Sequence, residues 1–161
     1  MLTVLFLVLL QVPACPPGDA CDAQVTAIYA DGMAAARRAS AAGGSAESLN
    51  PVRAAAAALE QISEGRPGPA EIARFVVLAA AAAAQSERDE MGAYLAQAID
   101  MELLQLAAGQ PGAPGLSALE AAGDLWLQVH RFEDATAAYQ RAATYLGLTP
   151  RIQAGLAKAA R

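Results

Sequence analysis

Aromatic and metal-binding side chains are scarce in this chain of 161 residues. Phe, Trp and Tyr together make up 5% of it, and it has one histidine and two cysteines. A structural zinc site takes about four ligands, mostly Cys and His. The lone His130 falls in an expected turn next to Arg131, where a histidine is a solvated or capping residue. We therefore expect no metal, no other cofactor and no enzymatic activity.

Basic charge and strand patterns are also missing. The net charge is −5, and the 11 basic residues form no cluster along the chain, which argues against a nucleic-acid partner. No segment alternates between apolar and polar residues in the way of a half-buried strand. Hydrophobic residues nevertheless make up 55% of the chain, much of this as alanine in the runs 54–58 and 79–84. Alanine is the strongest helix former and the smallest core residue that favours helices, so we predict an all-α domain of tightly packed helices.

Clusters of Gly and Pro divide the chain into helical segments. The main separators are residues 42–44, 65–69 and 109–115. Helices are predicted near residues 22–42, 45–64, 69–87, 89–108, 116–129, 132–146 and 150–160. Paired in order, they give three antiparallel hairpins at about 22–64, 69–108 and 116–147, followed by one further helix.

Between residues 116 and 149, small and aromatic side chains recur at helical spacing. They are Leu119, Ala122, Gly123 and Trp126 on the first predicted helix, and Ala135, Tyr139 and Ala142 on the second. The stretch resembles the tetratricopeptide repeat, a helix-turn-helix unit of about 34 residues. Small residues at 123 and 135 let two helices approach closely. We predict that Trp126 and Tyr139 pack together in the core beside that crossing.

Fainter copies of the pattern precede this one. Phe75, Leu78, Ala79 and Ala82, followed by Met91, Leu95 and Ala98, take equivalent positions 44 residues earlier. The first hairpin offers only Gly32 and the trio Ala55, Leu59 and Ile62, so it is either a third copy or an ordinary hairpin. The resemblance implies a right-handed solenoid of stacked hairpins, in which each hairpin buries its apolar face on a neighbour.

The helix at 150–160 has an apolar stripe formed by Ile152, Leu156 and Ala159. One interpretation is a C-terminal capping helix that covers the third hairpin. The other is the first half of a repeat that another chain completes. Lys158 and Arg161 in the last turn suit a helix terminus, and the capping helix is our prediction.

In the tetratricopeptide family, ligands lie along the concave surface made by the first helix of each hairpin. Carried over by position, this surface contains Glu120, Asp124, Leu127, Gln128, Val76 and Ala80. The resemblance thus implies a protein or peptide partner with basic and apolar residues. A solvated helix face is the alternative for Glu120 and Asp124.

The N-terminus has the pattern of an export signal. Residues 2–10 are almost wholly apolar, too few to span a bilayer but the right number for a signal peptide, and a Pro-rich segment follows. We predict a signal peptide at 1–14, or extending to 20, and a single domain at 15–161. Residues 12–15 resemble a bacterial lipobox, which implies lipidation of Cys15; ordinary cleavage after Ala14 or Ala20 is an alternative. A retained Cys15 could also form a disulfide with Cys21 in an oxidising compartment.

Taken together, these patterns predict a non-enzymatic interaction scaffold or adaptor of the bacterial periplasm or envelope. A different class of function fits the same residues. The chain could be a structural solenoid fragment that associates with its own copy or docks on a larger repeat protein.

Overall fold

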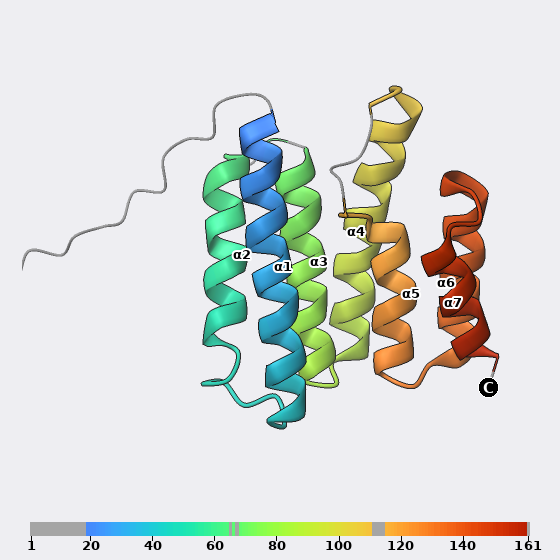
Figure 1. Cartoon of the computed structure of the whole chain (residues 1–161). Coiled ribbons are helices and arrows are strands. Elements are labelled where there is room, and N and C mark those ends of the chain that lie inside the picture. The colour runs from blue at the N-terminus through green and yellow to red at the C-terminus, as the bar shows by residue number, and fades with distance from the viewer. Residues whose placement is uncertain (1–18, 65, 67, 111–114, 161) are drawn as a thin grey trace, which may run out of the picture.

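The computed structural model describes residues 19–64, 66, 68–110 and 115–160, and all regular secondary structure in these residues is α-helical. The helices are α1 (Asp19–Ala41), α2 (Asn50–Ser63), α3 (Pro69–Ala84), α4 (Arg88–Ala107), α5 (Ala118–Gln128), α6 (Phe132–Leu146) and α7 (Pro150–Ala159). They stand side by side from α1 and α2 at one end to α6 and α7 at the other (Figure 1). The predicted all-α class is confirmed. In the described part of the chain, no helix is long and apolar enough to cross a bilayer.

The helices form two layers. The odd-numbered helices contact one another in succession, α1 with α3, α3 with α5 and α5 with α7. Each even-numbered helix packs on the odd-numbered helices beside it, and α2, α4 and α6 make no packing contacts with one another within the described residues. The contact between α4 and α5 is less extensive than the contact between α2 and α3. The boundary between the second and third hairpins is therefore the most loosely packed one.

Helix α3 lies at the centre of the core. Ten of its residues are buried, among them Ile72, Val76, Val77 and most of its alanines. A helix that is apolar on all sides must be covered on all sides, and α3 indeed contacts α1, α2, α4 and α5. The alanine run at 79–84 lets these neighbours approach its backbone.

Helix α2 starts later than the sequence predicts. The expected range was 45–64, but the helix begins at Asn50, where Pro51 occupies its first turn. The preceding residues form a turn in which the Ser48 hydroxyl donates to the Ser45 carbonyl at 2.8 Å and the Ser45 hydroxyl accepts from the Ser48 N–H at 3.2 Å. These local side-chain bonds compete with a helical backbone, and Leu49 is fully buried beneath the turn.

The three hairpin turns share one backbone feature. Gly43, Ser86 and His130 each follow the first helix of a hairpin and adopt a left-handed conformation, with φ of 79°, 64° and 58°. The residue after Ser86 donates its N–H to the Ala82 carbonyl at 2.9 Å, and the residue after His130 donates to the Trp126 carbonyl at 2.9 Å. These bonds satisfy carbonyls that the helix end leaves open. Positions in the three hairpins can therefore be matched by counting from the left-handed residue of each turn.

Helix α5 is held at its N-terminus by a buried carboxylate from α4. Glu102 is 4% exposed, and its Oε2 accepts the Leu119 N–H at 2.8 Å. The hydroxyl of Ser117 accepts from the Glu120 N–H at 3.2 Å as the N-cap. Burial raises the pKa of Glu102 above its ordinary value of 4.5, although its hydrogen bonds at the start of α5 act in the opposite direction. Glu102 thus fixes α5 against α4 across the long connection that joins them.

Tyr139 on α6 joins α5 to α7. Its ring is fully buried between two glycines: a Cβ atom added to Gly123 of α5 would lie 2.4 Å from the ring, and one added to Gly155 of α7 would lie 2.2 Å from it. Any side chain at either glycine would overlap the ring. The small residue predicted at 123 is therefore required by a close contact, although that contact is with a ring rather than with a helix backbone.

The prediction that Trp126 packs with Tyr139 in the core is wrong. Trp126 is half-buried and faces α4, where it lies 3.8 Å from the position of a Cβ added to Gly92. Its ring is also 5.9 Å from the guanidinium carbon of Arg131. Gly155 takes the place beside Tyr139 that we predicted for Trp126. It belongs to α7, which lies outside the 34-residue motif.

Candidate functional site

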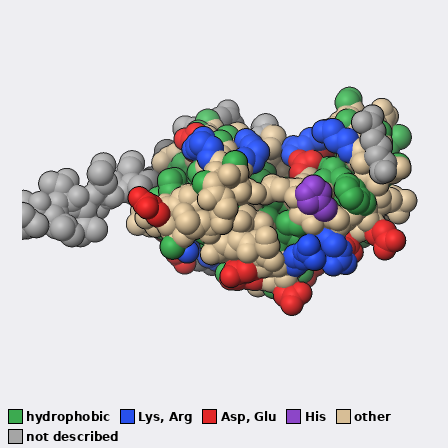
Figure 2. Space-filling view, turned by 90° about the horizontal axis from the view of Figure 1, so that it is seen from below, with side chains coloured by type: hydrophobic (Ala, Val, Ile, Leu, Met, Phe, Trp, Pro, Cys, Tyr) green, Lys and Arg blue, Asp and Glu red, His purple; other side chains and the backbone are tan. Residues whose placement is uncertain are grey.

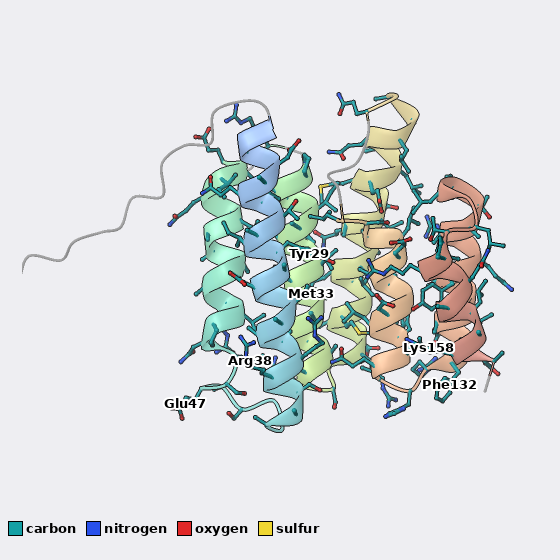
Figure 3. All side chains as sticks on the ribbon, viewed as in Figure 1. Tyr29, Met33, Arg38, Glu47, Phe132 and Lys158 are labelled. Atoms are coloured by element: carbon teal, nitrogen blue, oxygen red, sulfur yellow. The ribbon has the colours of Figure 1, made fainter. Side chains whose placement is uncertain are left out.

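A groove of about 320 Å³ runs between α1 and α5, with α3 as its floor. Tyr29, Met33 and Arg37 of α1 line one wall on successive turns (Figure 3 shows the first two). Ala80 of α3 contributes to the floor. Because the odd-numbered helices form one layer, this groove lies on the face made by the first helix of each hairpin.

The opposite wall consists of Asp124, Leu125 and Gln128 of α5, and Arg151 of α7 lies at its edge. Leu125 is 2% exposed, so the wall is apolar at its base and polar at its rim. The Nε2 atom of Gln128 is buried and has no acceptor among the described residues. Because this nitrogen is buried, it is not exposed to a ligand in the groove.

Three of the lining residues are equivalent in position. Arg37, Ala80 and Asp124 each lie six residues before the left-handed residue of their hairpin turn. Successive hairpins therefore place corresponding residues around the same groove: Arg37 and Asp124 at its walls and the buried Ala80 at its floor. A surface built in this way from corresponding positions suits an extended ligand that crosses all three helices.

A polar network joins the rim of the groove to α7. Arg151 Nη2 donates to Asp124 Oδ2 at 2.5 Å, and its Nη1 lies 3.3 Å from Glu120 Oε2. The Tyr139 hydroxyl donates to Asp124 Oδ1 at 2.5 Å, and the Thr149 hydroxyl donates to Glu120 Oε1 at 3.0 Å. All four carboxylate oxygens thus have partners within the chain.

Tyr29 brings a phenol that stays protonated. Burial raises the pKa of Tyr29 to about 12, and the nearby charges of Arg151 and Asp124 have smaller, opposed effects. At neutral pH the side chain is therefore a neutral donor and acceptor on an otherwise apolar ring, and it offers no nucleophile.

The residues predicted for partner binding are only partly brought together. Asp124, Gln128 and Ala80 line the groove. Glu120 lies beside the groove with its side chain 14% exposed, engaged by α7, and Leu127 is half-buried against the core. Val76 is fully buried inside α3, so its prediction as a surface residue of the groove is wrong. Its β-branched side chain belongs to the contact of α3 with neighbouring helices.

Sequence reasoning missed Tyr29, Met33, Arg37 and Arg151. The first three were accessible to it: they stand four residues apart, and counting back from Gly43 gives the same position for Arg37 as for Asp124. The prediction places the motif's glycine of the first hairpin at Gly32. Measured from the left-handed residue of the turn, Gly32 lies one helical turn earlier than Gly123 does in the third hairpin, so the two hairpins do not align on these glycines. No sequence pattern indicates Arg151, because its position at the groove depends on how α7 packs against the third hairpin.

A second hollow lies on the other face, between α4 and α6. Its volume is about 310 Å³, and Leu95, Ile99 and Trp126 contribute its apolar lining, with Asp134 and Arg141 at α6. It exists because α4 and α6 do not pack against each other. Trp126 covers the base of this gap, which explains its partial exposure.

No protein-family model, curated protein or solved structure matches the chain.

The remaining candidate positions are His130 and Cys15. His130 occupies an exposed turn as predicted, with its ring 6.1 Å from that of Phe132. Figure 2 shows the histidine on the lower face between hydrophobic and basic side chains. The described residues contain no group of three or more His, Cys, Asp or Glu side chains that could hold a metal. Cys15 lies outside the described residues, as do residues 1–14, so the predicted signal peptide, lipidation and disulfide stay predictions.

Proposed function

We propose that the protein is a non-enzymatic interaction scaffold that binds an extended segment of a partner protein in the groove between α1 and α5. The observation that carries this proposal is the equivalent placement of Arg37, Ala80 and Asp124 in three successive hairpins. Repeated helical hairpins that present one continuous surface are typical of peptide-binding solenoids, including the tetratricopeptide repeats that residues 116–149 resemble. On this proposal the chain is a right-handed solenoid of three hairpins with α7 as its cap.

The outward face of α7 supports the capping role. Ile152, Gly155 and Ala159 are buried against the third hairpin. The exposed side of the helix carries Ala154 and Lys158 and no large apolar side chain among the described residues. A helix that awaited a further repeat would need an apolar stripe on that side as well.

The proposal includes an extracytoplasmic location in a bacterium. Its support is the sequence of residues 2–20, in which a short apolar run precedes a Pro-rich segment with small residues before each cysteine. The partner would accordingly be a periplasmic or envelope protein.

Photo-crosslinking tests the groove directly. A photoreactive residue replaces Met33 in one full-length variant and Ala57, on the exposed side of α2, in a control variant. Both are expressed in the native envelope, irradiated and analysed by mass spectrometry. We expect a discrete adduct at position 33 that is missing at position 57. Equal labelling of the two variants, or an adduct at position 57 alone, would refute binding in the groove.

Self-association is the second candidate, and one surface favours it. Tyr145 and Leu148 are 53% and 58% exposed and lie close together in the sequence, near the junction of α6 and α7. A structural solenoid fragment would use such an end to contact its own copy. Sedimentation velocity separates the two candidates. A dimer that becomes monomeric in the Leu148→Ser variant supports self-association. A parent protein that sediments as a monomer at every concentration excludes it.

A further inference from the structure

If the groove binds a partner segment, as the proposed function states, the charges around it determine which segments it accepts. The sequence alone suggests an acidic strip that would attract basic residues, because Glu120 and Asp124 stand one turn apart on α5. In the folded chain both carboxylates are engaged by Arg151, and their other oxygens accept hydroxyl groups. A basic side chain of a partner would have to displace Arg151 to reach them.

Arg37, by contrast, has no ion pair or hydrogen bond among the described residues, although it lines the same groove. Its side chain is exposed, so it remains hydrated until a ligand arrives. Across the groove, the Gln128 amide nitrogen is buried without an acceptor. Arg37 is therefore the charged group lining the groove that has no partner among the described residues, and a guanidinium, which only donates, selects acceptors.

Apolar residues also line the groove between its two walls. They are Met33, Ala80 and Leu125. We propose that the groove recognises an extended peptide segment with aliphatic residues around one acidic side chain, whose carboxylate pairs with Arg37. Arg37 is thus the residue that determines specificity, and Arg151 acts by masking the two acidic groups.

The test uses defined peptides and the full-length chain. Three probes share the sequence acetyl-Ser-Ala-Leu-Xaa-Ala-Leu-Ser-amide and carry Glu, Gln or Lys at Xaa. Each is titrated into the isotope-labelled protein, and amide NMR shifts report both the binding site and the affinity. Arg37→Gln removes the proposed charge, and Arg38→Gln is the matched control. Arg38 is the next residue of α1 and is exposed, but it does not line the groove.

We expect the Glu probe to shift amides of residues 29–37 and 124–128 and to bind about ten-fold more tightly than the Gln probe, the value of one charged hydrogen bond. The Lys probe should bind most weakly. Arg37→Gln should abolish the preference for Glu over Gln, and Arg38→Gln should keep it. A preference that survives Arg37→Gln, or tightest binding of the Lys probe, would overturn the inference.

The scaffold function and the preference for an acidic segment can be refuted separately. Probes that bind in the groove without regard to charge would refute acidic selectivity and leave the scaffold function intact. Probes that shift no groove amide would refute both. Arg151→Gln adds an independent test, because unmasking Glu120 and Asp124 should raise the affinity of the Lys probe; an unchanged Lys affinity in a folded Arg151→Gln protein would refute the masking.

Discussion

The contact of Tyr139 with Gly155 predicts that an ordinarily favourable substitution is harmful. Replacing an exposed glycine inside a helix by alanine stabilises a protein by about 1 kcal/mol, because alanine restricts the unfolded chain and favours the helix. At Gly155 the new Cβ would lie 2.2 Å from Tyr139 Cζ, whereas carbon atoms prefer about 3.5–4 Å. One of the two groups must therefore move by more than an ångström.

Neither group can move cheaply. The Tyr139 ring is fully buried, its other face lies against Gly123, and its hydroxyl is bonded to Asp124. Overpacking of this kind costs about 1–3 kcal/mol. We predict that Gly155→Ala loses about 1–2 kcal/mol of unfolding free energy after the gain in helix propensity, and that its Tm falls by roughly 3 °C or more.

Gly92 supplies the matched control. It also lies within a helix, but a Cβ added there meets only Trp126, at an ordinary contact distance of 3.8 Å. Gly92→Ala should therefore gain about 0.5–1 kcal/mol in the same urea titration. The opposite signs of the two variants are the decisive result. If Gly155→Ala stabilises the protein as Gly92→Ala does, the ring does not lie between the two glycines, and the docking of α7 is wrong.

Four other outcomes are expected. Trp126→Ala should cost about 1–3 kcal/mol in urea unfolding, less than a fully buried tryptophan, because the side chain is half-buried; a loss above that range would place it in the core. The pKa of Glu102 is raised on folding, so the stability contributed by its protonated form is present below pH 4.5 and is lost as the pH rises through the raised pKa. The parent should accordingly lose stability relative to Glu102→Gln between pH 4 and pH 7, and a constant difference would contradict the buried carboxylate. Truncation after Thr149 should lower the Tm and promote aggregation, since it exposes the surface that α7 covers; an unchanged monomer would mean that α7 covers nothing. Intact-mass measurement of the native protein should show the loss of at least residues 1–14, with added lipid if Cys15 is acylated, and a mass that includes Met1 would exclude cleavage.

The helical spacing of apolar residues, together with the Gly and Pro clusters, was sufficient to predict most helices. The Gly and Pro clusters at 65–69 and 109–115 separate the helices of the structure, and Thr149 is the N-cap of α7 just ahead of Pro150. The start of α2 was missed because Ser45 and Ser48 form a local turn that a count of apolar residues does not register. Local signals identify helices well, but they do not reveal side-chain bonds that replace a helical turn.

The candidate site was harder to predict for a different reason. Asp124 and Gln128 follow from position along a helix, and the structure places both at the groove. Whether a carboxylate there is available to a ligand depends on residues far along the chain, here Arg151, which is 27 residues from Asp124. Glu102 is a similar case, because a charged residue in the middle of a helix reads as solvated until the fold brings it to the N-terminus of another helix. Long-range pairing of this kind leaves no periodic signal.

Helix α7 therefore links the stability of the fold to the chemistry of the groove. Gly155 lets the helix lie against Tyr139, and that contact positions Arg151 one turn away, beside two carboxylates. Without α7, Asp124 would keep only its bond to Tyr139, and the rim of the groove would present negative charge to a ligand. With α7 in place Arg151 engages both carboxylates and offsets one of their two charges, and on the proposed function Arg37 on the opposite wall is the unpaired charge that a partner meets. On the proposed function, the helix that covers the third hairpin thus also influences the charge that the groove's ligand carries.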